Sequence, residues 1–227
     1  MKKSKAETAE TRKRIIEAAQ REFRRNGVKG TGVSEVMAAA GLTHGGFYRH
    51  FESKEQLIAE VLDQATHIGA GNAESAAEGG PEAIRSYVES LLSKTYRDDR
   101  LDGCVLVSMG SELARSDDSV RHAASNGFKA LVEAFTRYYS DAGPEAEGEA
   151  IFTMSSLIGA MTMARMIDDP AFSDRVLEEA KKRLVKTPAK LSTKASTKAP
   201  AARKTPARKT STTTARRGRA PGVPHSS

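Results

Sequence analysis

The sequence predicts an all-α protein. Apolar residues recur at the three-and-four spacing of one helix face along the chain up to about residue 185, and the period-2 alternation typical of strands is missing. Hydrophobic residues make up 38% of the 227 residues, which is enough for a helical core of medium size. After residue 185 the apolar pattern stops, so we expect the helical part to end there.

The first predicted helix lies near the N-terminus. Its apolar face repeats at helical spacing, and Asn26-Gly27 supplies residues that commonly end a helix. The apolar positions are Ile15, Ile16, Ala19 and Phe23, and the opposite face carries Arg14, Arg21, Arg24 and Arg25.

Two shorter helices follow, with a tight turn between them. Thr31 or Gly32 can cap the second helix, and Gly41 ends it where the chain must turn without a Cβ clash. A very short third helix covers residues 44–50. Residues 11–57 therefore have the layout of a helix-turn-helix domain.

A long fourth helix begins within the same segment. Ser53, with Gln56 three residues later, forms the pattern of a capping box, in which side chains satisfy the first free backbone N–H groups. The apolar residues that continue this helix are Leu57, Ile58, Val61 and Leu62.

One dense series of residues in this segment matches a known family. It runs in register through Ile16, Ala18-Ala19, Phe23, Gly27, Thr31, Ala40-Gly41, Phe47-Tyr48, His50-Phe51 and Ser53-Lys54-Glu55 with Leu57. The segment resembles the DNA-binding domain of TetR/AcrR-type transcriptional regulators. The resemblance implies a homodimer with two DNA-reading heads and a C-terminal ligand-sensing domain. It also implies that the protein acts as a repressor, as members of the family usually do.

The side-chain chemistry and this resemblance together predict the DNA contacts. Tyr48, His50 and Lys54 can donate to phosphate oxygens beside the free N–H groups of a helix start, and the family register assigns them there. The positions nearest the base edges include glycines, which let the backbone approach the groove closely. The full predicted set is Thr31, Ser34, Thr43, His44, Gly45, Gly46, Tyr48, His50 and Lys54. Ser34 departs from the basic residue that members often carry at that position.

Several of these residues have an alternative interpretation. Tyr48 could be a half-buried packing residue, and His50 and Lys54 could be solvated surface residues.

Residues 58–185 predict a helical ligand-sensing and dimerisation domain. Apolar stripes cover residues 84–92 and 120–135, and Asp102-Gly103-Cys104 opens a helix that in the family lies beside a ligand cavity. We expect a small-molecule effector, apolar or electrophilic, because methionine and aromatic side chains adapt to irregular apolar ligands. The expected lining residues are Tyr87, Tyr96, Cys104, Met109, Phe128, Met154 and Met161, each of which could instead be an ordinary core residue.

Cys104 is the single cysteine of the chain. A thiol near a helix N-terminus can ionise and react with electrophiles or oxidants, and some relatives sense in that way. The carboxylates of Asp98, Asp99 and Asp102 would oppose ionisation if they lay close in space. A small buried cysteine without a sensing role is the alternative.

Residues 149–166 predict a helix suited to close packing. Its small residues are Ser155, Ser156, Gly159, Ala160 and Ala164. Together with the amphipathic helix that follows, up to residue 184, it suits the four-helix interface of a homodimer. Packing within one chain is the alternative.

Charge divides the chain into regions. The net charge of +7 combines +5 over residues 1–57, −9 over residues 58–185 and +11 over residues 186–227. We expect a basic N-terminal arm at residues 1–10, the helix-turn-helix domain at residues 11–57, the sensing and dimerisation domain at residues 58–185 and a disordered tail, rich in Lys, Arg, Ala, Pro and Thr, at residues 186–227. Such a tail resembles those of linker-histone-like proteins and can add salt-sensitive, weakly sequence-dependent DNA affinity. A merely solvated tail is the alternative.

The sequence gives little support to catalysis. It has no zinc-ligand spacing, no phosphate-binding glycine loop and no nucleophile with an evident base, so we expect no enzyme activity, no cofactor and no metal. The N-terminus lacks the apolar core of a signal peptide, and the most apolar stretch, residues 151–167, is too short and too polar to span a bilayer. We therefore expect a cytoplasmic, nucleoid-associated protein without membrane contact.

Two functions remain open from the sequence. The first is a dimeric repressor that a small molecule releases from a pseudo-palindromic operator in double-stranded DNA. The second is an architectural nucleoid protein whose basic tail supplies most of the affinity.

Overall fold

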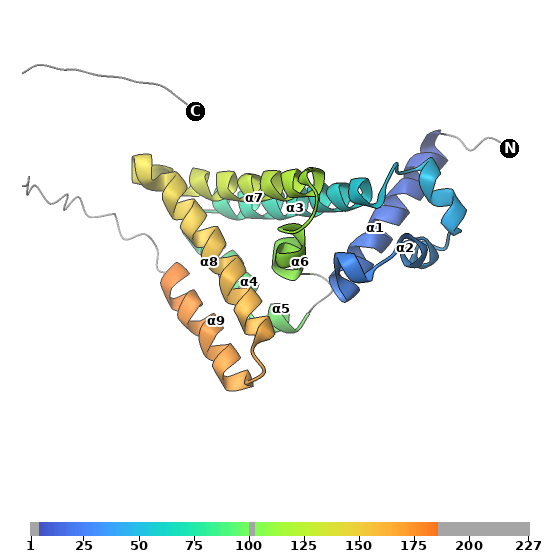
Figure 1. Ribbon diagram of the computed structural model, residues 1–227. Helices are drawn as coiled ribbons and strands as arrows, with labels where there is room; N and C mark the ends of the chain where they lie inside the picture. Colours follow the sequence, from blue (N-terminus) through green and yellow to red (C-terminus); the bar gives the residue numbers. More distant parts are fainter. Residues whose placement is uncertain (1–4, 100–102, 186–227) are drawn as a thin grey trace, which may run out of the picture. The chain divides into compact units, whose positions relative to one another are not determined.

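The computed structural model describes residues 5–99 and 103–185, and every regular element within those ranges is helical (Figure 1). The predicted all-α class is therefore confirmed. The expectations for residues 1–4, for Asp102 and for the basic tail at residues 186–227 fall outside the described residues. Residues 5–10, which we expected in the basic arm, form the first turns of a helix, because they contain no helix breaker and place Glu7 in the first turn.

The first helix, α1 (Lys5–Gly30), is interrupted at Gly27, where φ is 76°. Residues other than glycine rarely adopt this backbone conformation, so Asn26-Gly27 ends the regular helix as predicted. The buried face of α1 consists of Ile15, Ala18, Ala19 and Phe23.

The second helix, α2 (Val33–Ala39), begins after Gly32 and is followed by a turn at Gly41, where φ is 68°. The third predicted helix forms as a single 3-10 helix, η1 (His44–Arg49). A short segment with two adjacent glycines favours this tighter form over an α-helix, because glycine disfavours the α-helical interior.

The fourth helix, α3 (Lys54–Glu78), begins with the predicted cap. The Ser53 side chain accepts the N–H of Gln56 at 3.1 Å, and the Gln56 side chain turns back to the N–H of Glu52 at 2.6 Å. The helix then continues without a break, so the predicted domain boundary between residues 57 and 58 falls inside α3. One rigid element is thus shared by the two predicted domains.

The remaining elements follow α3 along the chain. They are α4 (Pro81–Leu91), α5 (Lys94–Asp98), α6 (Val105–Leu113), α7 (Asp118–Tyr138), η2 (Ser140–Glu145), α8 (Ala146–Met166) and α9 (Pro170–Leu184). Among them, α4, α6 and α7 contact α3. Helix α7 runs beside α3, while α8 contacts both α7 and α9 (Figure 1).

Two apolar clusters form the core. The first joins α1, α2, η1 and the start of α3 to Val105, Met109 and Leu113 of α6 and to Val120 of α7. The second joins the later part of α3 to α4, α7, α8 and α9. Because Leu106 packs against both clusters, α6 connects the helix-turn-helix domain to the C-terminal helices.

Helix α8 keeps part of its apolar surface exposed. Phe152 and Met166 have 60% and 69% of their surface exposed, although Met154 and Met161 on the other side are buried. None of the helices in the described ranges is long and apolar enough to span a membrane.

Candidate DNA interface and ligand cavity

The segment around η1 presents three predicted contact residues to solvent. Thr43, His44 and Gly45 are exposed at the start of this helix. Beneath them Phe47 is fully buried, and its ring stacks on that of Phe51 with 5.5 Å between the centroids. The buried aromatic pair therefore fixes the backbone whose outer side carries the exposed residues.

Ser34 forms a hydrogen bond with His44 on this surface. Its Oγ lies 3.1 Å from Nδ1 of His44, and both side chains are exposed. When the serine hydroxyl donates to Nδ1, the neutral ring carries its proton on Nε2, which can donate to a base edge. Gly46 is half-buried, and a Cβ at this position would lie 3.5 Å from Cε of Met37.

Tyr48 has 67% of its surface exposed, so it is not the half-buried packing residue of the alternative interpretation. Its ring makes an edge contact with Phe47, with 5.2 Å between centroids and an interplanar angle of 88°. His44 lies 6.4 Å away on a second edge contact. The two contacts orient the ring, and exposure leaves the hydroxyl accessible to a phosphate oxygen.

Lys54 and the backbone of His50 both form hydrogen bonds within the helix-turn-helix domain. Nζ of Lys54 donates to the backbone oxygen of Val28 at 2.6 Å. The guanidinium of Arg12 donates to the backbone oxygen of His50 and to the carboxylate of Glu60. An ammonium has three hydrogens, so Lys54 retains donors for a phosphate, and its phosphate role stays a prediction.

The structure does not support a DNA contact from the Thr31 side chain. Thr31 is fully buried, and its hydroxyl donates to the backbone oxygen of Gly27 at 2.8 Å and lies 3.2 Å from that of Glu22. This hydroxyl therefore links Thr31 to the backbone of α1 on both sides of Asn26. Its match to the family pattern therefore reflects a structural role.

A partly open cavity of about 210 Å³ lies mainly among the C-terminal helices. Five of the seven expected lining residues surround it: Tyr87, Tyr96, Cys104, Met154 and Met161. The other lining residues, which sequence reasoning missed, are Arg24, Ala65, Thr66, Ile68, Gly69, Asn72, Leu91, Gly103, Val105, Val107, Leu131, Leu157 and Ile158. Most are small or apolar residues that carry no sequence signal separating a cavity wall from a packed core.

Two expected lining residues do not line this cavity. Met109 is buried in the cluster that α6 shares with the helix-turn-helix domain, so it serves domain packing. Phe128 is partly buried against the second cluster but lies outside the cavity wall. Helical periodicity predicted that Met109 and Phe128 face the interior, but it did not indicate which residues they would contact.

Two tyrosines and Cys104 supply polar groups to the cavity wall. Tyr96 Oη accepts the backbone N–H of Cys104 at 2.8 Å, and Tyr87 Oη lies 3.5 Å from the backbone oxygen of Gly69. Burial raises the pKa of Tyr87 to about 12 and also raises the pKa of Tyr96, so both phenols stay protonated at neutral pH. Cys104 is a half-buried free thiol at the start of α6, and its role as a sensor stays a prediction.

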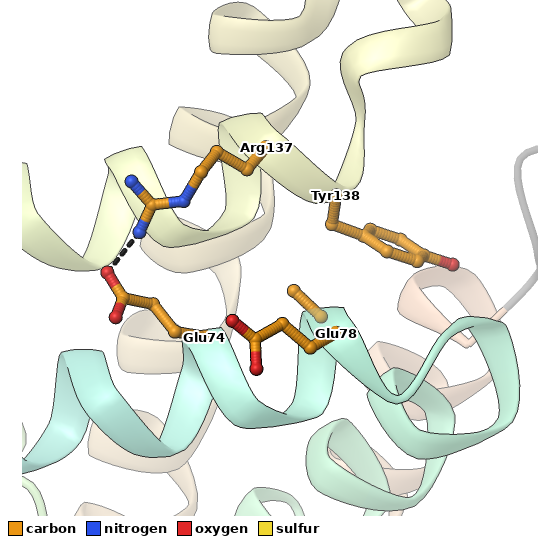
Figure 2. Close-up of a pocket in the computed structure, with 5 residues that line it drawn as sticks. Glu74, Glu78, Arg137 and Tyr138 are labelled. Carbon is orange, nitrogen blue, oxygen red and sulfur yellow. Dashed lines mark hydrogen bonds and ion pairs between the residues drawn. The ribbon is translucent and has the colours of Figure 1, made fainter.

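A larger hollow of about 440 Å³ lies at the surface, between the ends of α3 and α7. Figure 2 shows Arg137 and Tyr138 of α7 above Glu74 and Glu78 of α3, with an ion pair between Arg137 and Glu74. The side chains of Arg137 and Glu74 are 59% and 46% exposed, so this hollow is solvated, and charged side chains make up much of its wall beside Ala77 and Tyr138. No group of three or more His, Cys, Asp or Glu side chains in the described ranges could hold a metal ion.

Two family profiles match the chain. One, described as bacterial regulatory proteins of the tetR family, matches residues 15–61, and the other, described as the C-terminal domain of LmrA/YxaF-like transcriptional regulators, matches residues 81–179. The chain belongs to the TetR family. The first range contains the exposed η1 segment, and the second contains most of the cavity wall.

Individual relatives resemble this TetR-family protein over different lengths. The HTH-type transcriptional regulator AcrR of Shigella flexneri is 34% identical over 103 residues, which cover 44% of this chain and 48% of AcrR. The HTH-type transcriptional repressor NemR of Escherichia coli strain K12 is 24% identical over 127 residues, which cover 54% of this chain and 64% of NemR. The chain thus spans about half to two thirds of the length of these curated relatives.

Solved structures show the shared fold over most of the chain. The reduced form of E. coli NemR gives a TM-score of 0.68 at 19% identity and covers 77% of this chain and 95% of that chain. AibR in complex with isovaleryl coenzyme A and operator DNA gives a TM-score of 0.56 at 19% identity, covering 77% of this chain and 98% of that chain.

Proposed function

We propose that this TetR-family protein is a dimeric transcriptional repressor that binds an operator in double-stranded DNA and is released by a small molecule. The observation that carries the proposal is the exposed surface of η1, where His44 and Tyr48 stand on a buried aromatic base. AcrR is named as a transcriptional regulator and NemR as a transcriptional repressor, which supports the same function here. The proposed activity is binding without catalysis.

The proposed DNA contacts divide by chemistry. Tyr48, His50 and Lys54 bind phosphate oxygens, whereas Thr43 and His44 meet base edges, with the ring of His44 oriented by Ser34. Gly45 and Gly46 allow the backbone to approach the groove. Each head reads few bases, so specificity requires two heads in successive major grooves about 34 to 36 Å apart.

The proposed dimer interface is the exposed row on α8. Its members follow one another at intervals of three and four residues, which places them on one face of the helix: Phe152, Ser155, Gly159, Met163 and Met166. Phe172 of α9 adds a further exposed apolar side chain. A row of small and apolar residues allows close packing against the same helix of a second copy.

The proposed effector site is the cavity of about 210 Å³ among the C-terminal helices. Its wall includes the start of α6, and α6 packs against the helix-turn-helix domain. A ligand that displaces α6 or α3 therefore changes the position of the reading head. AibR was crystallised with both a small molecule and operator DNA, which supports a function with two ligands.

The decisive test is DNA footprinting of the full-length protein on genomic fragments at about 150 mM salt. We expect protection of a discrete palindrome, with weaker protection in His44→Ala and Tyr48→Phe at the same protein concentration. Uniform binding to all fragments would contradict the proposal.

A second measurement concerns residues 186–227, whose net charge is +11. We propose that this tail adds nonspecific affinity and nucleoid association to a specific reading head. Removing it should flatten the salt dependence and leave the sequence preference intact. If its removal abolishes all DNA binding, the architectural function replaces the regulatory one.

A further inference from the structure

Ser34 and His44 form a contact between two elements of the helix-turn-helix domain. Ser34 lies in the first turn of α2 and His44 is the first residue of η1. The two residues are ten positions apart in the chain, and the turn at Gly41 separates their helices. Oγ of Ser34 lies 3.1 Å from Nδ1 of His44, and both side chains are exposed. The pair therefore stands on the surface that is proposed to meet DNA.

Tyr48 makes a second contact with the ring of His44. The two rings meet edge to face, with 6.4 Å between their centroids and 84° between their planes. Tyr48 in turn makes an edge contact with the buried ring of Phe47. Contacts with Ser34 and Tyr48 together restrict the rotation of the histidine side chain. The second ring nitrogen, Nε2, is therefore presented in a preferred orientation.

The contact with Ser34 is compatible with a hydrogen on Nε2 in two of the three states of the ring. When the Ser34 hydroxyl donates to Nδ1, the neutral ring carries its hydrogen on Nε2. In the charged ring both nitrogens carry hydrogens, and the Ser34 oxygen then accepts. The negative charge of the DNA phosphates favours these two states, because each places positive charge at Nε2. Close to DNA, Nε2 of His44 is therefore a hydrogen-bond donor.

A single donor in the major groove distinguishes the bases. Guanine presents two adjacent acceptors, N7 and O6, whereas cytosine presents only a donor. Adenine presents one acceptor beside a donor, and thymine presents one acceptor beside a methyl group. The donor at Nε2 is thus best matched by guanine, and cytosine at the same position would leave it without a partner.

Gly45, next to His44, is consistent with a close approach of DNA. It is exposed, and a Cβ at this position would lie in open space with respect to the described residues. Packing against the described part of the chain therefore does not require glycine here. A glycine also allows the surface of a partner to come close to the backbone, which would bring the neighbouring histidine to a base edge.

We infer that Ser34 is a positioning residue that directs Nε2 of His44 to a guanine in each half of the operator. Members of the family often carry a basic residue at the position of Ser34. In this chain the serine hydroxyl instead bonds to His44 and acts through it. The inference rests on the proposed repressor function and names one base that each reading head selects.

The test starts with selection of an operator by the full-length protein from a library of random-sequence DNA duplexes. Fluorescence anisotropy then measures binding to the selected operator and to duplexes in which each base pair is exchanged in turn. We expect one guanine in each half-site whose exchange for cytosine weakens binding about tenfold, the usual order of effect of one mismatched base pair. Inosine keeps N7 and O6 and lacks only the minor-groove amino group, so it should replace this guanine without loss of affinity.

Substitutions assign this preference to the two residues. His44→Ala should remove the guanine preference and leave the preferences at other positions. Ser34→Ala should reduce it to about threefold, and Ser34→Thr, which keeps the hydroxyl, should restore it. In the His44→Ala background, Ser34→Ala should have no further effect at this position. His122→Ala, which changes an exposed histidine of α7, is the matched control and should keep the full preference. Melting temperatures should stay the same, since both side chains are exposed.

Each of four results would overturn the inference. They are a discrete operator without a base preference that depends on His44, a dependent position that prefers another base, loss of binding to the inosine duplex, and an undiminished guanine preference in Ser34→Ala. Any of them beside a discrete operator rejects this inference alone. A library that yields no enriched sequence rejects the proposed repressor function, and the inference with it.

Discussion

Gly127 of α7 packs against α3 at a point where no side chain fits. It is buried, and a Cβ at this position would overlap Cγ2 of Thr66 and lie 2.6 Å from Oγ1 of the same residue. Thr66 is itself buried, and its hydroxyl donates to the backbone oxygen of Leu62 at 2.7 Å. The threonine therefore cannot rotate away without losing that hydrogen bond, and Gly127→Ala must push α7 from α3.

Two effects of opposite sign determine how much Gly127→Ala changes the free energy of unfolding. Overpacking in a core costs about 1–3 kcal/mol, while replacing glycine by alanine inside a helix gains about 1 kcal/mol. Gly71→Ala provides the matched control, because Gly71 is an exposed residue of α3 with open space around its Cβ position. We expect the control to be stabilised and Gly127→Ala to be less stable than the control by about 1–3 kcal/mol.

Thermal unfolding by circular dichroism, at one protein concentration, measures this difference. For a protein of this size each kcal/mol corresponds to about 2–4 °C in melting temperature. Thr66→Ala removes the two atoms nearest the added methyl group, so it should recover part of the loss in the Gly127→Ala background. Equal melting temperatures for Gly127→Ala and Gly71→Ala would refute the reasoning, because the close approach of the two helices would then cost nothing.

Three further substitutions test separate parts of the structure. Tyr48→Phe should weaken operator binding about tenfold, measured by fluorescence anisotropy, because it removes one hydrogen bond to a charged phosphate, while the melting temperature stays the same. Thr31→Ala should lower the free energy of unfolding by about 1–3 kcal/mol, and its DNA footprint should show unchanged sequence preference. If the variant instead keeps its stability and loses sequence preference, the Thr31 side chain contacts DNA after all. Hydrogen bonds from Lys94 and Arg97 lower the pKa of Asp174, so this carboxylate stabilises the fold above the usual carboxyl pKa and the effect is lost as pH falls through the lowered value. Asp174→Asn should therefore be less stable than the unsubstituted protein at neutral pH, and urea unfolding should show the difference narrowing in strongly acidic solution.

The helices and their ends could be predicted because they depend on residues close in the chain. The cap at Ser53 and the break at Gly27 follow from bonds and backbone angles within a few residues. The exposed segment at residues 43–48 could be located for the same reason, with the family pattern fixing its register. The 3-10 form of η1 was not predicted, since the sequence indicated only a very short helix.

The partners of individual side chains could not be predicted in the same way. Lys54 bonds to Val28, which lies 26 residues earlier, and Met109 joins a core built largely by the N-terminal helices. Helical periodicity identifies the buried face of a helix but does not say which element covers it.

By itself the sequence determined the all-α class, the helix-turn-helix segment and five of the side chains that line the cavity. Only the tertiary structure decided that Thr31 is buried, that α3 crosses the domain boundary and that Arg24 of α1 reaches the cavity. The physical reason is the range of the interactions involved. Caps and turns are fixed by neighbours along the chain, whereas a cavity wall exists only where helices distant in sequence pack together.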